Sequence, residues 1–263
     1  MSAPARAKTL VFMSADIAHS TVFKEARQAM DRTAGWLEPF AAFFRELPLV
    51  FMGQIASVFD DAEDLPNVWV WRVSGDDVVF LAEPEHADEA ARLLKAFHLT
   101  VNLYHARISS RWPLGLRGCC WAARFPERNI EIEIPEMATA GRGGGMTYFE
   151  YLGPEVDAGF RIADHAPVGQ VIVSLNLAEA IAYDAHGHGL WFHRVGQEIL
   201  KGVYAEQPYP LLLIGPSDPY PLGPAGPEPN ATALSPGSLL EMSTRLHCRL
   251  NRDYRLGLAA LEF

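Results

Sequence analysis

The sequence contains little cysteine. There are three cysteines in 263 residues, and Cys119 and Cys120 are adjacent. A disulfide framework needs an even set of spaced cysteines, so this count excludes one and is typical of a reducing compartment. We therefore expect the protein in the cytoplasm.

Positive charge and long apolar segments are also scarce. Lysine and arginine number 22 against 32 aspartate and glutamate residues, which gives a net charge of −10. Nucleic-acid-binding proteins usually present a basic face, so we expect no nucleic-acid partner. No apolar run approaches the roughly 18 residues of a membrane span. The segment MSAPARAK at the start lacks a long apolar stretch followed by a cleavage site, so we predict neither a membrane span nor a signal peptide.

The sequence does contain alternating apolar strands and amphipathic helices. Hydrophobic residues make up 49% of the chain, enough for a sizeable core. Apolar runs at residues 8–15, 67–73 and 78–82 predict strands, and the apolar stripe in residues 84–109 predicts a long helix. The hairpins are antiparallel, so we expect an α+β fold with one mixed, mostly antiparallel sheet and helices on one face.

The predicted organisation has three parts. Residues 1–215 form the main domain. Proline and glycine are dense over residues 216–237, which predicts a linker. Residues 238–263 form a C-terminal helical appendage that docks on another surface or exchanges with it.

Aspartates stand at two strand ends. Asp16 directly follows the apolar segment TLVFMSA, and small residues then lead into a helix that begins near Ser20. Asp76 and Asp77 lie in the tight turn between the strands of the hairpin at residues 68–82. An aspartate after one strand and another in a neighbouring turn can converge on a hard divalent cation. These stretches predict a metal site for a nucleoside triphosphate.

Each aspartate also has a structural interpretation. Asp16 fits a helix N-cap, and Asp76 and Asp77 fit ordinary turn positions. Within the predicted site we expect Asp76 to face the metal and Asp77 to point to the opposite face, because neighbouring strand residues alternate. Substitution of Asp77 should then cost less activity than substitution of Asp76.

Further motifs lie downstream. Residues 153–161 read GPEVDAGFR, residues 168–174 read VGQVIVS, and residues 200–203 read LKGV. Together with MSADIAHST at residues 13–21 and RVSGD at residues 72–76, they stand in the order and spacing of the class III nucleotidyl cyclases. Residues 8–214 therefore resemble the catalytic domain of that family.

The resemblance implies a ferredoxin-like cyclase fold that forms a head-to-tail homodimer, with each active site between two protomers. One protomer would hold two divalent ions, Mn²⁺ or Mg²⁺, through Asp16, Asp76 and the backbone carbonyl of Ile17. Such ions lower the pKa of the ribose 3′-hydroxyl and neutralise the triphosphate. Backbone N–H groups at the following helix start would bind phosphate. This phosphate-binding turn consists of Ala18, His19, Ser20 and Thr21.

The other protomer would supply the remaining groups. Arg161 would stabilise charge on the α-phosphate, and Lys201 would reach the terminal phosphates. Asp157 stands four residues before Arg161, so both side chains project from one helix face. The family has an asparagine that orients the ribose at the position of Asp157.

Two more positions differ from the adenylate cyclases of this class, which read adenine with a lysine and an aspartate or threonine. The matching residues here are Arg72 and Glu150, which are bulkier and favour a pyrimidine base. With the replacement at Asp157, the chain resembles the bacterial anti-phage pyrimidine cyclases of the Pycsar type. That resemblance implies cUMP, or otherwise cCMP, as a signal for a separate effector, with UTP as the favoured substrate.

Two alternatives remain open. One is a purine cyclase, adenylate or guanylate, in which Arg72 and Glu150 read the base differently. The other is a catalytically weak, cyclase-like dimer that binds a nucleotide and regulates a partner. Both metal aspartates are present, which disfavours the second alternative, whereas the change to Asp157 keeps it open.

Overall fold

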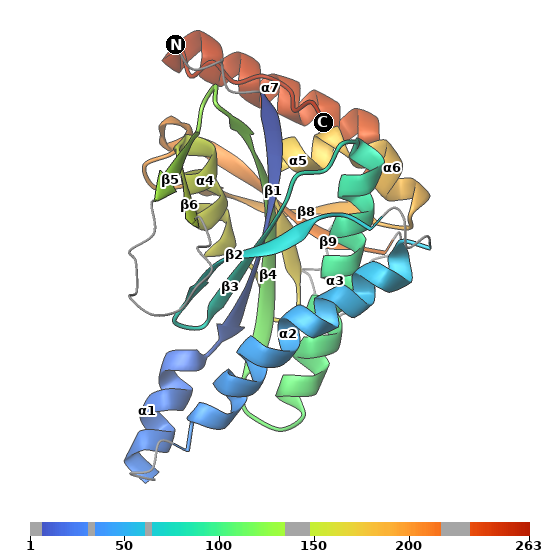
Figure 1. Cartoon of the computed structure of the whole chain (residues 1–263). Coiled ribbons are helices and arrows are strands. Elements are labelled where there is room, and N and C mark those ends of the chain that lie inside the picture. The colour runs from blue at the N-terminus through green and yellow to red at the C-terminus, as the bar shows by residue number, and fades with distance from the viewer. Residues whose placement is uncertain (1–6, 31–34, 61–64, 135–147, 217–231) are drawn as a thin grey trace.

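A computed structural model describes residues 7–30, 35–60, 65–134, 148–216 and 232–263. Its central feature is an eight-stranded sheet with the order β10-β8-β9-β7-β4-β1-β3-β2 (Figure 1). Within the described residues, β4 and β7 pair in parallel and the other neighbours are antiparallel, so the predicted mixed α+β class is confirmed. The strands are β1 (Lys8–Ala18), β2 (Val68–Ser74), β3 (Asp77–Ala82), β4 (Gly115–Phe125), β7 (Val171–Val173), β8 (Trp191–Ile199), β9 (Pro208–Gly215) and β10 (Thr232–Leu234).

Strand β1 lies inside the sheet between β3 and β4 and is buried on both faces. A strand with both faces covered carries apolar residues at successive positions, which explains the run TLVFMSA. The strand extends three residues beyond the predicted segment 8–15, because its backbone stays paired with β4 as far as Gly115. Asp16 therefore lies within β1 and not after it.

Two long helices, α2 (Leu37–Val58) and α3 (Ala87–Ser109), cover one face of the sheet (Figure 1). An aromatic cluster joins them to it. The ring of Phe51 in α2 lies 5.0 Å from that of Phe80 in β3 and 5.4 Å from that of Phe97 in α3, measured between centroids. These edge-on contacts fix both helices on the sheet.

The segment after Asp16 forms two helices, α1 (Ser20–Met30), which begins where the sequence predicted a helix start, and α2. Pro39 lies in the first turn of α2, where backbone N–H groups have no helical partner. Helix α2 continues past Pro48 as far as Val58. Among the described residues, α2 alone is long and apolar enough to cross a membrane, and one of its sides packs in the protein core.

The opposite face carries helix α4 (Pro154–Ala163) and the hairpin of β5 (Ile130–Ile134) and β6 (Tyr148–Leu152). In β4, Gly118 lies against α3 and the next residue, Cys119, lies against α4. Successive strand residues point to opposite faces, so the sheet has helices on both faces and the prediction of one covered face is wrong.

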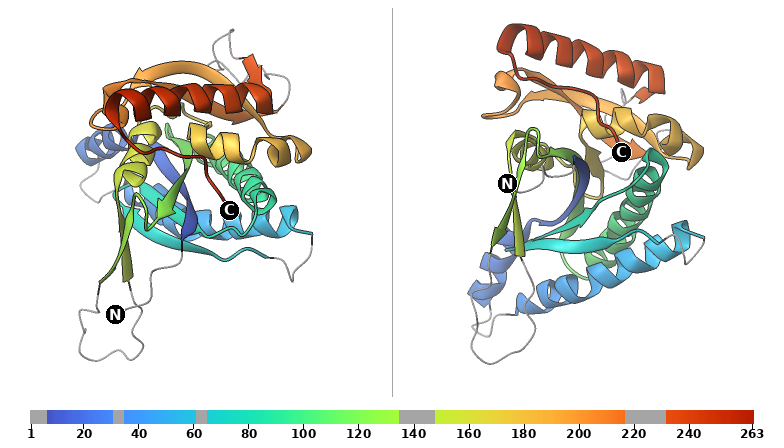
Figure 2. Two further views of the ribbon diagram at one scale, coloured as in Figure 1. Left: turned by 90° about the horizontal axis from the view of Figure 1, so that it is seen from above. Right: turned by 45° about the horizontal axis from the view of Figure 1, so that its top comes forward.

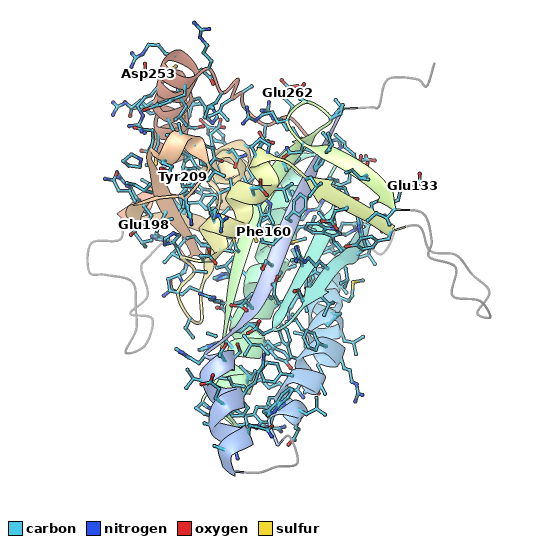
Figure 3. The ribbon with its side chains drawn as sticks, turned by 90° about the vertical axis from the view of Figure 1, so that its left-hand side faces the viewer. Glu133, Phe160, Glu198, Tyr209, Asp253 and Glu262 are labelled. Carbon is cyan, nitrogen blue, oxygen red and sulfur yellow. The ribbon has the colours of Figure 1, made fainter. Side chains whose placement is uncertain are left out.

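The α4 face has an aromatic layer of its own. The rings of Phe12 in β1 and Trp121 in β4 stack 5.1 Å apart, measured between centroids, and the ring of Phe160 lies 5.2 Å from that of Trp121. Figure 3 labels Phe160 on α4. Gly159 allows this approach, because a Cβ at that position would lie 2.2 Å from ring atoms of Trp121. The position of α4 on the sheet therefore depends on a glycine at 159.

A buried ion cluster anchors the start of α4. Glu155, only 5% exposed, accepts hydrogen bonds from the Arg124 backbone N–H at 2.8 Å and from the Asn129 side-chain amide at 2.9 Å. The guanidinium groups of Arg124 and Arg128 each lie 3.2 Å from the same carboxylate. Arg128 also donates to the Leu256 carbonyl, which ties the end of the chain to α4.

The C-terminal part packs on the same core. Strand β10 pairs with β8, and α7 lies alongside α5 (Figure 2). Leu239, Leu246 and Leu250 of α7 are buried. Of the predicted linker, residues 217–231 lie outside the described residues, and 232–234 form β10. The remaining helices are α5 (Leu175–Ala180), α6 (Ala182–Gly187), the 3₁₀ turn η2 (Tyr204–Glu206) and α7 (Pro236–Tyr254).

Candidate functional site

The candidate site lies at the end of β1 where α1 begins. Asp16 is paired in register with Asp77 of β3 on one side and with Arg117 of β4 on the other. Residues in register on adjacent strands point to the same face, so all three side chains lie on the face that carries α4. The Arg117 Nε donates to the Asp16 carboxylate at 2.7 Å.

The hairpin turn brings Asp76 beside β1. Gly75 adopts a φ of 65° in the two-residue turn between β2 and β3, a conformation that glycine adopts without steric cost. The Asp76 carbonyl accepts the Ile17 backbone N–H at 3.0 Å, and the Asp76 carboxylate accepts the Ser20 hydroxyl. The turn is thus attached to both the end of β1 and the start of α1.

Asp77 also faces the site, so the prediction that it points away is wrong. Its carboxylate accepts the hydroxyl of Ser14, a residue of β1 on the same face as Asp16. The alternation rule misled because Asp76 belongs to the turn and not to a strand. The predicted difference between Asp76 and Asp77 in catalysis therefore loses its structural reason.

Burial and mutual repulsion shape the electrostatics. Burial raises the pKa of Asp16, although the hydrogen bond and charge of Arg117 lower it and the charge of Asp76 raises it further. Burial raises the pKa of Asp77 to about 6, against the hydrogen bond from Ser14, and the charges of Asp16 and Asp76 add to the increase. Three carboxylates beside one guanidinium give the site an excess of negative charge.

This donor set fits a divalent cation. Carboxylate oxygens are the ligands that Mg²⁺ and Mn²⁺ prefer, and a cation would offset the repulsion. Within the described residues, no three histidine, cysteine, aspartate or glutamate side chains form a ready metal cluster. Asp16, Asp76 and the Ile17 carbonyl would thus be a partial ligand set, and Mg²⁺ sites commonly leave several positions to water and phosphate.

The predicted phosphate-binding turn surrounds the start of α1. Ala18 ends β1, and His19 adopts a left-handed φ of 66° immediately before the helix. Helix α1 begins at Ser20, and its first turn, including Thr21, presents backbone N–H groups and the positive end of the helix dipole. The three nearby carboxylates would repel an anion bound at this helix start. The arrangement therefore suits an anion that arrives together with cations.

The two predicted base-reading residues lie on neighbouring elements. Arg72 of β2 is exposed, and its guanidinium carbon lies 5.8 Å from the centroid of the Phe160 ring in α4. Glu150 of β6 accepts the hydroxyl of Tyr148 at 3.1 Å. Burial and the Glu150 hydrogen bond raise the pKa of Tyr148, whereas the nearby Arg72 charge lowers it. Tyr148 thus lies near both residues.

The three residues expected to serve a partner's site are all exposed. Asp157 and Arg161 project from α4, and Lys201 lies in the turn between β8 and β9. No hydrogen bond or ion pair among the described residues joins them to the carboxylates of the same chain. This exposure suits contact with a second protomer.

Four features of the site were not predicted from sequence: Ser14, Tyr148, Arg117 and the bond from Ser20 to Asp76. Ser14 had a signal, because it precedes Asp16 by two residues on one strand and so shares its face. Tyr148 had the same signal, because it precedes Glu150 by two residues on β6. Arg117 had none, since its place depends on which strands become neighbours.

The sequence matches no protein-family model and no curated protein sequence. Solved structures do match. The adenylyl cyclase CyaB from P. aeruginosa gives a TM-score of 0.57 at 14% identity, covering 81% of this chain and 96% of its own. The guanylate cyclase domain of RhGC from Catenaria anguillulae gives 0.53 at 12% identity, covering 81% and 99%.

Adenylate cyclases from Trypanosoma brucei give a TM-score of 0.52 at 14% identity, covering 88% of this chain and 94% of their own. At these identities the likeness concerns the fold. The chain has the mixed α+β fold of the class III nucleotidyl cyclase catalytic domain.

Proposed function

We propose that the protein is a nucleotidyl cyclase that converts a nucleoside triphosphate to its 3′,5′-cyclic monophosphate and pyrophosphate. The observation that carries this proposal is the convergence of Asp16 and Asp76 at the start of α1, held by the Ile17–Asp76 backbone bond. Carboxylates suit divalent cations and a helix start suits phosphate, so the pair suits a metal-bound triphosphate. Solved structures with this fold are adenylyl and guanylyl cyclases, one of them in complex with GTP.

In this reaction the ribose 3′-oxygen attacks the α-phosphorus, the bond to the bridging oxygen of the β-phosphate breaks, and pyrophosphate leaves. Two divalent ions, Mn²⁺ or Mg²⁺, would lower the pKa of the 3′-hydroxyl and offset the charge of the triphosphate. Asp16, Asp76 and the Ile17 carbonyl would hold them, and the turn from Ala18 to Thr21 would bind phosphate oxygens.

The proposed enzyme is a head-to-tail homodimer with shared sites. Arg161 would stabilise charge on the α-phosphate, Lys201 would contact the terminal phosphates, and Asp157 would orient the ribose of the partner's substrate. Their exposure on α4 and on the β8–β9 turn supports this division.

Mixing two inactive variants tests the shared site. Asp76→Ala protein and Arg161→Ala protein should each be inactive, and an exchanged mixture should recover part of the wild-type activity. Recovery is expected because one of the two sites in a mixed dimer contains both intact halves. Subunit exchange, followed with differently tagged chains, without any recovery would contradict sites built across the dimer.

For the base we propose UTP, with CTP next. The solved structures of similar fold favour a purine, since they are adenylyl and guanylyl cyclases. The larger side chains of Arg72 and Glu150, with Tyr148 beside them, favour the smaller pyrimidine ring. Uracil presents carbonyl acceptors and one N–H donor, which a guanidinium and a carboxylate can complement.

Incubating the purified protein with each of the four triphosphates and Mn²⁺, and identifying the products, tests both the cyclase activity and the choice of base. We expect UTP to be cyclised much faster than ATP or GTP. Arg72→Ala should reduce this preference by about 1–3 kcal/mol, because the bound base would lose a hydrogen-bond partner. Equal rates with ATP would make the protein a purine cyclase. Binding of triphosphate without any product would favour the regulatory dimer, which the change at Asp157 keeps open.

The cellular role follows from the resemblance to the Pycsar-type cyclases. We propose a cytoplasmic enzyme that makes cUMP as a signal in anti-phage defence, read by a separate effector that senses the cyclic nucleotide. The buried, unpaired thiols of Cys119 and Cys120 suit a reducing compartment.

A further inference from the structure

A second concave surface lies between helix α7 and the hairpin of β8 and β9 (Figure 2). Strand β10 leads directly into the start of α7, and near the other end of the helix Arg249 donates to the Pro208 carbonyl at 3.3 Å. Between these two attachments is a groove with a volume of about 600 Å³. We call it the α7 groove, and its lining includes Arg194, Gln197, Pro208, Met242, Arg245 and Arg249.

One face of α7 forms the first wall of the α7 groove. The lining residues of this helix run from Ser238 to Arg249 and recur at intervals of three and four positions, which places them on one side of the helix. Leu239 and Leu250, which are buried in the protein core, do not belong to this face. The helix therefore has a second face, which presents charged side chains to the groove.

A β-bulge in β8 forms the opposite wall. The register with β9 shifts between Arg194 and Gly196, so the extra residue Val195 places Arg194 and Gln197 on the same side of the strand. Arg194 donates to the side-chain oxygen of Gln197 at 3.2 Å, and both residues line the groove. The bulge thus adds a third arginine to the two on α7.

Positive charge is in excess in the α7 groove, although the whole chain has a net charge of −10. Of the described residues that line it, Arg194, Arg245 and Arg249 are cationic and Glu241, which pairs with Arg245, is the carboxylate. Neither Arg194 nor Arg249 forms an ion pair with any described residue, and the Arg249 Nε is buried without an acceptor. Two positive charges thus remain unbalanced, and a phosphate monoester dianion would offset them.

The remaining lining of the groove is largely apolar. It comes from Met242 and Leu246 of α7 and from Pro208 and Pro210 of β9. Small-molecule sites combine such apolar surface with a few polar groups, in volumes of about 300–1,000 Å³. An unbranched methionine side chain adapts to the shape of a bound ring. The lining therefore suits a ligand with a phosphate at one end and a ring at the other.

We propose that the α7 groove is a binding site for a nucleoside monophosphate, separate from the candidate active site. The arginines bind the doubly charged phosphate, because guanidinium groups bind phosphate oxygens through parallel N–H donors. The apolar residues contact the ring of the base. The groove shares no residue with the candidate active site, so the proposal does not depend on the cyclase activity.

Isothermal titration calorimetry of the full chain with AMP tests this site. The titration is made in EDTA, because without cations the carboxylates of the candidate active site repel phosphate. We expect one AMP to bind per chain. Adenosine and inorganic phosphate should each bind at least about tenfold more weakly than AMP, because each offers only the apolar or only the charged part of the ligand.

Substitutions in the groove should act in two directions. Arg249→Gln and Arg194→Gln should each weaken AMP binding about three- to tenfold, because each removes a charge-assisted contact to phosphate. Glu241→Gln should strengthen it about two- to threefold, because a negative charge leaves the groove. Arg252→Gln is the matched control, since Arg252 lies on the same helix, pairs with Asp253 and does not line the groove. It should leave the affinity unchanged.

Absence of AMP binding, or binding of inorganic phosphate as tight as that of AMP, overturns the proposal. Equal weakening by Arg252→Gln would show general charge attraction and overturns it as well. Arg249 also holds the Pro208 carbonyl, so if Arg249→Gln does not fold, Arg194→Gln and Glu241→Gln at exposed positions give the comparison. Lower thermal stability of Arg194→Gln with unchanged AMP affinity would assign the arginines to contacts within the chain and would also overturn the proposal.

Discussion

Strand β4 carries an arginine–carboxylate pair near each end, and the two pairs differ in charge balance. Near its end, Arg124 and Arg128 both contact the single buried carboxylate of Glu155. Near its start, Arg117 contacts Asp16, which lies beside two further aspartates. The first cluster has an excess of positive charge and many internal hydrogen bonds, whereas the second has one arginine beside three carboxylates.

This difference in charge balance indicates a structural role for the Glu155 cluster and a functional role for the Asp16 cluster. A buried charge surrounded by partners holds elements together, and its removal leaves the partners uncompensated. A cluster with surplus carboxylates is unfavourable in the isolated chain and becomes favourable when a cation arrives from solution. The comparison assigns Glu155 to the fold and Asp16 to the proposed chemistry, and the following variants test that assignment.

The largest effect should come from Asp16→Asn or Asp76→Asn. Each should lower cyclase activity roughly 10³-fold or more, because metal ions supply several kcal/mol of transition-state stabilisation. Thermal unfolding should stay close to that of the wild-type protein. The exposed Asp253, paired with Arg252 on α7, provides the control Asp253→Asn, which should retain full activity. An active Asp16→Asn enzyme would remove the functional half of the comparison.

Glu155→Gln should show the reverse pattern. We expect a loss of about 3–5 kcal/mol in the free energy of unfolding, since two arginines would lose their buried counter-charge. Urea titration measures this loss. The control is Glu127→Gln, whose carboxylate lies 3.6 Å from Arg124 but is 64% exposed, so it should change stability by less than about 1 kcal/mol. Equal effects of both substitutions would show that Glu155 is not a structural charge.

The smallest effect should come from Asp77→Asn. In EDTA this variant should be more stable than wild-type protein by on the order of 1 kcal/mol, because one of three neighbouring like charges is gone. The amide oxygen can still accept the Ser14 hydroxyl, so that hydrogen bond need not be lost. Addition of Mn²⁺ should stabilise the variant less than it stabilises the wild-type protein. Lower stability in EDTA would mean that the three carboxylates do not repel significantly.

Local patterns predicted much of this molecule. The apolar run of β1 and the 68–82 hairpin are visible in the sequence, because burial and tight turns constrain neighbouring residues directly. The motifs also predicted that Asp16 and Asp76 lie close together. The hydrogen bond from the Ile17 N–H to the Asp76 carbonyl confirms this proximity for the backbone. Their roles as metal ligands remain predictions.

What the sequence did not reveal depends on long-range pairing or on turn geometry. Arg117 meets Asp16 across 101 positions because β4 became the neighbour of β1, and no local pattern encodes that choice. Asp77 was assigned to the wrong face because the Gly75 turn interrupts the strand alternation. The second covered face was missed because α4 is short and its burial depends on packing against Trp121.

That contact at Gly159 has a mechanical consequence. Trp121 is pressed against α4 on one side and stacked on Phe12 on the other, and Phe12 precedes Asp16 by four residues in β1. The helix that carries Arg161 and the strand that carries Asp16 are thereby locked into one rigid body, since close-packed interiors deform little. If the proposed dimer switches between active and inactive states, this packing favours a rotation of whole protomers against each other, with a trigger that acts at the interface between them.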